Sequence, residues 1–247
     1  MTMLKLSLFN PSSMYVKLKT LSVFLLLFSC ALNAENKITL GVVLFPPDSV
    51  LDISTKECVG DFIEITRQVI LEYSINIDTV CAPPIRIYRF LKNGGVDFTI
   101  NIKSTKAMPK NMVFTEIPFH TLNLNLYAHQ SAKEQKNVAV IRGFGYHGYR
   151  DKLVGEGFKV IELPTSVASL EVFLKKRSSH LLAYQSPVNY YLHMNKVDIG
   201  EYITVTPLLD IPTYYAISGS SPHLEKLLGA FNHYATKHRL ENFQQAK

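Results

Sequence analysis

The sequence lacks tryptophan and contains only three cysteines among its 247 residues. It has no G-x-S-x-G, H-E-x-x-H or C-x-x-C segment, which are the motifs of serine hydrolases, zinc peptidases and thiol oxidoreductases. The eight histidines are scattered, and the spacing of His233 and His238 does not place them on a shared helix face. We therefore expect no catalytic residue, no metal site and no cofactor.

The chain after residue 34 has only a small excess of positive charge. The chain has 26 Lys and Arg against 20 Asp and Glu, which gives a net charge of +6. Three of these cations, Lys5, Lys17 and Lys19, lie in the first 34 residues, which contain no acid, so the remainder carries +3. No basic cluster occurs in that remainder. A weak, dispersed positive charge does not favour nucleic acid as a partner.

Long hydrophobic runs are absent except near the N-terminus, where residues 21–28 read "LSVFLLLF". This run follows two lysines and precedes small residues up to Ala34, an order typical of a secretory signal peptide. The run is too short to span a membrane comfortably. We expect cleavage after Ala34 and a periplasmic mature protein of about 210 residues, a size that suits one large domain or two lobes.

The start codon and the anchoring of the mature protein each have an alternative interpretation. Translation can start at Met1 or at Met14, because residues 1–13 add nothing to the signal. The segment "LFSC" is a poor lipoprotein box, so lipid attachment at Cys30 is the alternative to a soluble protein.

Periodic apolar patterns in the first half of the mature chain alternate between strands and helices. Asp61 is expected to cap the first helix, with Glu64 completing a capping box. The order β-α-β-α-β predicts a parallel sheet with right-handed crossovers. The expected strands are 37–45, 75–80 and 96–102, and the expected helices are 60–73 and 84–94.

A second α/β series follows a long alternating strand at 121–129. The chain then returns through an extended segment to a final helix, for which Ser221 is the expected cap and Pro222 the first residue. The expected strands are 137–141, 158–162, 180–184 and 213–218, and the expected helices are 146–155, 166–176, 186–194 and 221–238.

These two series predict two α/β lobes. We expect a signal peptide at 1–34, the first part of lobe one at 35–124, lobe two at 125–209, and a return to lobe one at 210–247. Two strands, near 120–129 and 206–214, would then connect the lobes. Such a hinge leaves a cleft between the lobes, where small ligands usually bind.

The two cysteines of the mature chain, Cys58 and Cys81, are expected to form a disulfide because an exported protein meets oxidising conditions. Cys58 precedes the first helix and Cys81 ends the second strand. In a parallel sheet, both positions lie at the same edge, within reach of a bridge. Two buried free thiols are the alternative.

Several blocks of the chain together resemble the type II periplasmic solute-binding proteins, and most closely the extracellular solute-binding family 3. These blocks are "LGVVLFPP", "RIYRFLKNGGVDFTIN", "FTEIPF", "YQSPVNYYL" and "YYAISGSSPHLEKLL". The resemblance implies a two-lobed α/β fold, each lobe a mostly parallel sheet flanked by helices, with two hinge strands. It also implies a monomeric receptor that clamps a small polar solute for an ABC permease or a membrane sensor.

Three departures concern the way that this family holds an amino acid. Met108 stands where the resemblance implies a carboxylate-binding arginine, and Gln185 stands where it implies an aspartate for the ammonium group. Phe144 lies near the position of a helix-capping threonine. Each missing charged hydrogen bond is worth about 1.5–3 kcal/mol, so the ligand is not expected to be a free α-amino acid.

Candidate ligand-binding residues are those that follow strands or open helices at the expected cleft. Arg86 and Lys103 offer cations, and Phe45 offers an aromatic surface for stacking. Core packing or a solvated position is the alternative for each. The full set is Phe45, Arg86, Lys103, Thr105, Arg142, Tyr146, Tyr184 and Gln185.

Gly143, Gly145 and Gly148 form a literal G-x-G-x-x-G after a strand, and Glu162 follows near the end of the next strand. The second lobe has too few residues for the full dinucleotide-binding sheet, so we interpret the motif as a tight turn at the cleft. An enzyme on the same fold, and a sensory or protein-binding module without a transport role, remain the alternative functions.

Overall fold

The structure is a computed structural model that describes residues 37–132 and 134–246. The expected signal peptide, its cleavage after Ala34, the choice of start codon and Cys30 all lie outside the described residues. Residues from Ile38 onward form one compact unit. No helix in the described ranges combines the length and the apolar character needed to cross a bilayer.

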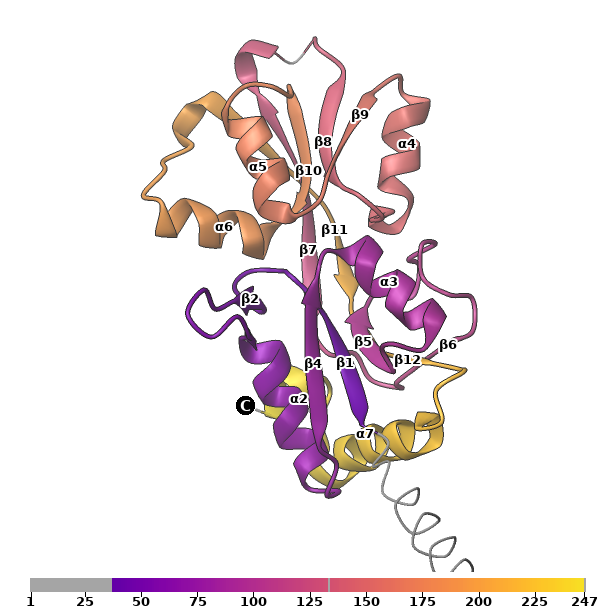
Figure 1. Ribbon diagram of the computed structural model, residues 1–247. Helices are drawn as coiled ribbons and strands as arrows, with labels where there is room; N and C mark the ends of the chain where they lie inside the picture. The colour runs from indigo at the N-terminus through magenta and orange to yellow at the C-terminus, as the bar shows by residue number, and fades with distance from the viewer. Residues whose placement is uncertain (1–36, 133, 247) are drawn as a thin grey trace, which may run out of the picture. The chain divides into compact units, whose positions relative to one another are not determined.

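The first of two five-stranded sheets has the strand order β4-β1-β5-β12-β6 (Figure 1). Its central strand β1 pairs in parallel with β4 and β5, as predicted. Strand β12 pairs antiparallel with β5 and β6. We call this sheet and its helices lobe 1. The strands are β1 (Ile38–Val43), β4 (Ile77–Ala82), β5 (Phe98–Asn101), β6 (Met112–Phe114) and β12 (Tyr214–Ser218).

Helices cover both faces of the lobe 1 sheet because successive side chains of β1 point to opposite sides. Leu40 and Val42 face an apolar cluster with α2 (Asp61–Leu71) and α7 (Leu224–His238). On the other face, α3 (Pro84–Asn93) packs close to Gly41, where an added Cβ would lie 2.9 Å from Ile87 Cγ2. Lobe 1 therefore has two small cores, one on each side of the sheet.

The predicted capping box of α2 is wrong. Gly60, not Asp61, is the N-cap residue, and no side chain caps the helix. The loop backbone lies too close for a side chain at this point, because a Cβ on Gly60 would lie 2.5 Å from the carbonyl oxygen of Asp48. That same carbonyl accepts a hydrogen bond from the backbone N–H of Phe62, which supplies the partner that a side-chain cap would have provided.

The final helix begins at Leu224, two residues after the predicted first residue Pro222, so Ser221 is not its cap. The Ser221 hydroxyl accepts a hydrogen bond from the His223 N–H at 3.1 Å and donates one to Asp97 Oδ1 at 2.6 Å. These bonds hold residues 221–223 in a turn before the helix. The predicted apolar face does face the core, where Phe231 stacks on Tyr215 with 3.8 Å between ring centroids.

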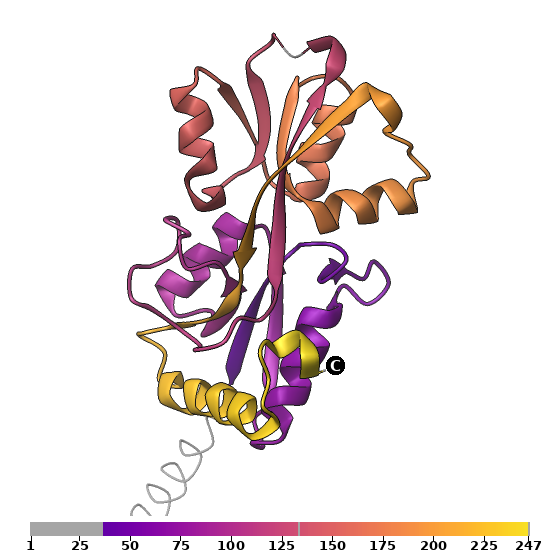
Figure 2. The same ribbon diagram turned by 180° about the vertical axis from the view of Figure 1, so that it is seen from behind.

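The second sheet has the order β11-β7-β10-β8-β9, and we call it, with its helices, lobe 2. Strand β8 pairs in parallel with β9 and β10, while β7 pairs antiparallel with β10 and β11. Helices α5 and α6 cover one face and α4 lies on the other side (Figure 2). The bounds are β7 (Thr121–His129), β8 (Asn137–Ile141), β9 (Lys159–Leu163), β10 (His180–Tyr184), β11 (Ile203–Pro212), α4 (Tyr149–Gly155), α5 (Ser166–Leu174) and α6 (Gln185–Met194).

The helix predicted at 146–155 is shorter than expected. Tyr146 and His147 have φ values of 47° and 53°, so residues Tyr146–Gly148 form a single 3-10 turn before α4. The remaining short helical segments are Gln130–Ala132, Gly200–Tyr202 and Phe243–Ala246.

Strands β7 and β11 pair along their length and bring both crossings of the chain to one place. At the lobe 1 ends of these two strands, the N–H of Thr213 donates to the His120 carbonyl at 2.8 Å, and the Thr213 hydroxyl donates to the same oxygen at 2.9 Å. The Phe119 N–H donates to the Thr213 carbonyl at 2.6 Å. The two predicted connecting strands are thus present, and they are tied together where they meet lobe 1.

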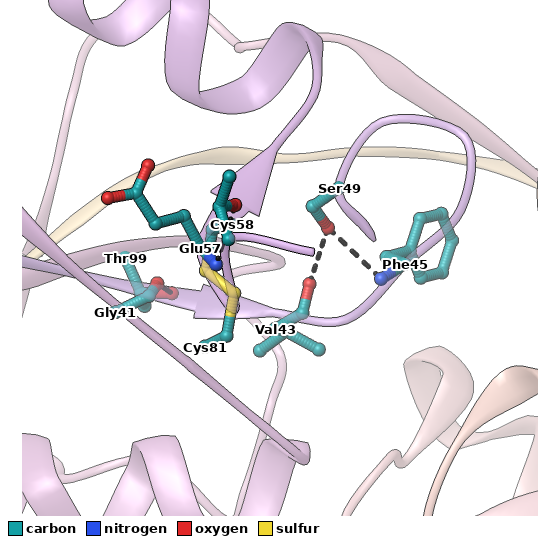
Figure 3. Close-up of a disulfide and its surroundings, with 9 residues drawn as sticks. Gly41, Val43, Phe45, Ser49, Glu57, Cys58, Cys81 and Thr99 are labelled. Atoms are coloured by element: carbon teal, nitrogen blue, oxygen red, sulfur yellow. Dashed lines mark hydrogen bonds between the residues drawn. A yellow bond between two sulfur atoms is a disulfide. The ribbon is translucent and has the colours of Figure 1, made fainter. Parts of the chain in front are cut away.

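The predicted disulfide joins Cys58 and Cys81, whose Cα atoms are 5.7 Å apart (Figure 3). It attaches a small hairpin, β2 (Val50–Leu51) with β3 (Cys58–Val59), to the edge strand β4. Beside it, the Ser49 hydroxyl donates to the Val43 carbonyl at 2.6 Å and accepts from the Phe45 N–H at 3.0 Å. These two bonds fix the loop that carries Phe45 away from the end of β1.

Candidate functional site

A small cavity lies at the junction of the two lobes. Its volume of ≈ 40 Å³ corresponds to roughly three water-sized probes. Its lining comes from both lobes, and no charged side chain is among it. The lining residues are Val43, Phe45, Phe62, Ile100, Asn101, Ile102, Thr105, Leu122, Phe144, Tyr184 and Thr213.

Aromatic rings from both lobes form one wall of this cavity. The Phe45 ring extends from lobe 1, and its centroid lies 5.6 Å from that of Tyr184 in lobe 2. Phe144 is 6.1 Å from the same tyrosine ring. Only 4% of Phe45 and 2% of Tyr184 are exposed. Contact between these rings excludes water from the junction and joins the lobes through apolar packing.

The polar side of the cavity is built around Asn101, the last residue of β5. Its Oδ1 accepts hydrogen bonds from the Ile102 N–H and from the Thr105 hydroxyl, each at 2.8 Å. Its Nδ2 donates to the Tyr88 hydroxyl at 3.0 Å. These bonds orient the buried Asn101 amide. Because an amide carries no charge, the polar side of the cavity can offer hydrogen bonds but no charge.

The Tyr184 hydroxyl has no hydrogen-bond partner within the described part of the chain. Burial raises the pKa of Tyr184, and the nearby hydroxyls of Tyr146 and Tyr88 raise it further. The side chain therefore stays protonated at neutral pH. Tyr184 lines the cavity, and its hydroxyl is a donor that a ligand could engage.

His120 lies beside the cavity at the crossing of the chain. Its ring centroid is 5.1 Å from that of Phe62, and its Nδ1 is 3.2 Å from the Thr213 hydroxyl. Burial lowers the pKa of His120 to about 4, so the imidazole is neutral near pH 7. Its Nε2 is buried and lacks a partner in the described structure.

A second, larger recess lies elsewhere along the lobe junction and is lined by three arginines. It has a volume of ≈ 280 Å³, and we call it the arginine groove. Arg86 and Arg89 come from α3 of lobe 1, and Arg142 follows β8 of lobe 2. Pro83, Ile85 and Pro164 complete its lining.

Three of the eight predicted site residues lie at the cavity: Phe45, Thr105 and Tyr184. Two more, Arg86 and Arg142, line the arginine groove instead. The sequence pattern predicted one cleft for all five residues, but the structure distributes them over two recesses that share no lining residue.

The other three predicted residues lie elsewhere. Gln185 lines a separate pocket beside β7 and β11. Lys103 is exposed, and its Nζ lies 3.9 Å from the ring centroid of Tyr214. Tyr146 is fully buried, and its hydroxyl accepts a hydrogen bond from the Ile141 N–H at 2.8 Å.

Two residues were missed as candidates although the sequence contained a signal for each. Asn101 is a polar residue at the end of a predicted parallel strand, where ligand-binding side chains usually lie. Arg89 follows Arg86 by three residues on a predicted helix, so the two share a helix face. Thr213 had no such signal, because its place at the cavity depends on the second crossing of the chain.

The two expected amino-acid anchors do not face each other across the cavity. Met108 is 7% exposed and packs in the apolar cluster around Ile87 and Leu91. Gln185 faces its own pocket. Phe144, the third departure, does line the cavity and makes its wall apolar.

The G-x-G-x-x-G motif is explained by the backbone conformation and close packing at its first glycine. Gly143 has a φ of +86°, and a Cβ there would lie 2.6 Å from the Ile85 Cδ1 of lobe 1. Glu162, the acidic residue that follows the glycine motif on the next strand, pairs with Arg150 at 2.5 Å and with Arg142 at 3.6 Å. The motif thus permits a tight turn and a close approach of the lobes.

Two polar contacts also cross between the lobes near α4. Lys106 Nζ lies 2.8 Å from Asp151 Oδ2, and the Ser104 hydroxyl lies 3.0 Å from His147 Nδ1. In the described ranges, no group of three or more His, Cys, Asp or Glu side chains is arranged to hold a metal ion.

Neither a protein-family model nor a curated protein matches this sequence. Solved structures do match. A histidine kinase sensor domain with similarity to periplasmic binding proteins aligns with a TM-score of 0.69 at 16% identity, covering 85% of this chain and 93% of that one. The GluR0 ligand-binding core in complex with L-glutamate aligns with a TM-score of 0.62 at 18% identity, covering 85% and 96%.

The arginine-, lysine-, histidine-binding protein ArtJ of Geobacillus stearothermophilus aligns with a TM-score of 0.67 at 13% identity, covering 85% of this chain and 93% of that one. These neighbours are binding proteins and a sensor domain. At such identities the likeness establishes the fold alone. The chain has the two-lobed fold of the type II periplasmic binding proteins, with two mixed sheets flanked by helices.

Proposed function

We propose that this protein is a periplasmic solute-binding protein that encloses a small, uncharged solute in the cavity between its lobes. The observation that carries the proposal is the composition of that cavity. Both lobes line it, aromatic rings form one wall, and Asn101, Thr105 and Thr213 supply polar atoms without charge. A site of this kind favours a compact molecule with an apolar body and one or two hydrogen-bonding groups.

The same lining argues against a free α-amino acid. A zwitterion enclosed without opposite charges would lose its hydration without compensation. Two missing charged hydrogen bonds, each worth about 1.5–3 kcal/mol, would weaken binding by several orders of magnitude. Two of the named neighbours bind amino acids, so this chain would share their fold with a different ligand class.

Closure of the lobes over the solute would be the signal that a partner reads. The expected signal peptide supports a periplasmic location, and the neighbours include both a binding protein and a histidine kinase sensor domain. The partner is accordingly an ABC permease or a membrane sensor. The aromatic contact of Phe45 with Tyr184 would form only when the lobes are together. The cavity wall that these two rings make would therefore be complete only in the closed state.

Thermal unfolding of the mature protein, residues 35–247, tests the proposal. Small uncharged alcohols and amides are compared with amino acids, amines and organic acids. A solute at 100 times its Kd stabilises the folded state by about 2.7 kcal/mol. The proposal predicts stabilisation by members of the uncharged group and none by α-amino acids. The reverse pattern would contradict it, and turnover of a stabilising compound would favour an enzyme.

A pair of variants assigns any such binding to the cavity. Val43 lines the cavity, so Val43→Phe should fill it and abolish the stabilisation. Ile53 is 92% exposed on the β2–β3 hairpin, so Ile53→Phe adds a similar volume in solvent and should leave binding intact. Equal binding by both variants would place the solute elsewhere.

A further inference from the structure

The arginine groove gathers cations from two parts of the chain that are distant in sequence. Arg86 and Arg89 lie three residues apart on α3, so they project from neighbouring positions on one helix face. Arg142 lies in the turn after β8, at the facing edge of lobe 2. Figure 1 shows α3 at the lobe junction, below α4. Three guanidinium groups therefore line one recess.

Acidic side chains do not balance this charge. Arg86 and Arg89 form no ion pair with any residue that the structure describes, and their recorded contacts are with the Phe90 ring, at 5.5 and 6.0 Å. Arg142 has one carboxylate, Glu162, at 3.6 Å, but Arg150 holds that carboxylate more closely at 2.5 Å. All three arginine side chains are exposed, so water screens their mutual repulsion and an anion from solution can reach them.

We propose that the arginine groove is a second ligand site, which binds a small organic anion carrying two or more carboxylate or phosphate groups. Guanidinium groups present paired donors that match the oxygens of both kinds of group. The groove volume of ≈ 280 Å³ exceeds that of the cavity and accommodates a ligand with a carbon skeleton. Pro83, Ile85 and Pro164 provide apolar walls against which such a skeleton can lie.

This site is independent of the proposed solute cavity. The two recesses share no lining residue, and one is apolar whereas the other carries three cations. The groove takes residues from both lobes, so an anion bound by all three arginines would favour the arrangement in which the lobes are together.

Isothermal titration calorimetry of the mature protein at low ionic strength tests the groove, with citrate and pyrophosphate as the probes. The proposal predicts saturable one-to-one binding of at least one of the two, and the preferred probe identifies carboxylate or phosphate as the recognised group. Arg86→Gln and Arg89→Gln should each raise the Kd about tenfold or more. The binding should weaken as KCl is added.

The matched control is Arg177→Gln, which removes the same charge from an exposed loop of lobe 2. It should leave the Kd nearly unchanged, because only the overall charge is altered. Absence of binding by both probes would overturn the proposal, and so would an equal loss in Arg177→Gln and Arg89→Gln. Val43→Phe should bind the anion normally, so failure of the solute cavity and failure of the arginine groove are distinguishable.

Discussion

The ammonium group of Lys106 in lobe 1 lies 2.8 Å from Oδ2 of Asp151 in lobe 2. Both side chains are largely exposed, at 81% and 65%, so water screens the pair and its contribution to closure is small. The hydrogen bond from Lys106 lowers the pKa of Asp151. The contribution is therefore present above the ordinary pKa of 3.8 and is lost as the pH falls through the lowered value.

Asp151→Asn should remove this contact at neutral pH and let the lobes separate slightly more often. Hydrogen–deuterium exchange should then be faster at the backbone amides of 104–108 and 146–151, with little change in the melting temperature. Glu171→Gln, which breaks an ion pair with Lys175 inside lobe 2, is the control. Equal exchange in wild type and Asp151→Asn would show that the pair does not contribute to closure.

Gly143→Ala should destabilise the protein by about 1–3 kcal/mol. Its φ of +86° is unfavourable for alanine, and the new Cβ would lie 2.6 Å from Ile85 Cδ1. Gly148 has a φ of +90° but no atom within 4 Å of its Cβ position, so Gly148→Ala reports the backbone strain alone. Urea unfolding should show a larger loss for Gly143→Ala, and adding Ile85→Ala should recover part of it. Equal losses at both glycines would mean that the lobes are not in contact there.

Acid should destabilise the protein through His120. Burial lowers its pKa from 6.5 to about 4, so the unfolded chain takes up a proton that the folded chain does not. The stability linked to His120 is fully present above pH 6.5 and is lost as the pH falls toward 4. Between pH 7.5 and 5 the loss is about 2 kcal/mol.

Urea unfolding at these two pH values measures that loss. His120→Gln should reduce the pH dependence by about the same amount. Part of the dependence should remain, because burial also lowers the pKa of His180. His233→Gln, which changes an exposed histidine, should keep the full wild-type dependence. An unchanged pH dependence in His120→Gln would contradict the assignment.

Replacing both Cys58 and Cys81 by serine should lower the free energy of unfolding. The disulfide closes a loop with a sequence separation of 23 residues. The chain-entropy model assigns about 3 kcal/mol to a loop of this length. Urea unfolding of the oxidised wild type, the reduced wild type and the double variant checks this value. The reduced wild type and the double variant should have the same free energy of unfolding, because both lack the disulfide.

Introducing the expected amino-acid anchors should not create an amino-acid site. Met108→Arg would place a charge in an apolar cluster, since Met108 is 7% exposed and packs near Tyr88. We expect a loss of several kcal/mol in unfolding free energy. Adding Gln185→Asp should not compensate, because Gln185 faces a different pocket. Amino-acid binding by the double variant, measured by calorimetry, would show that these two positions do converge.

Most of the strands could be predicted because their short β-branched runs are bounded by turn residues. The disulfide could be predicted because parallel strands bring the ends of β1 and β4 to one edge of a sheet. The first residues of the helices could not be predicted in the same way. The cap of α2 depends on the approach of Asp48 to Gly60, a contact that no local pattern reveals.

The candidate site was predicted only in part because side-chain direction at a strand end depends on the local turn. Tyr146 follows β8, as expected, but the left-handed turn at residues 146–148 directs its hydroxyl to the Ile141 N–H. Lys103 also follows its strand, but it lies over the ring of Tyr214, more than a hundred residues later. Contacts of this range are set by the tertiary fold.

The two crossings of the chain also impose an order on folding. The lobe 2 sheet is built from one continuous stretch, 121–212, so it can form from contacts within that stretch. The lobe 1 sheet is interrupted, because β5 pairs with β12 through Asn101 and Tyr214. The lobe 1 sheet therefore cannot be completed before β12 is available, and the edge of β5 that β12 covers stays unpaired until then.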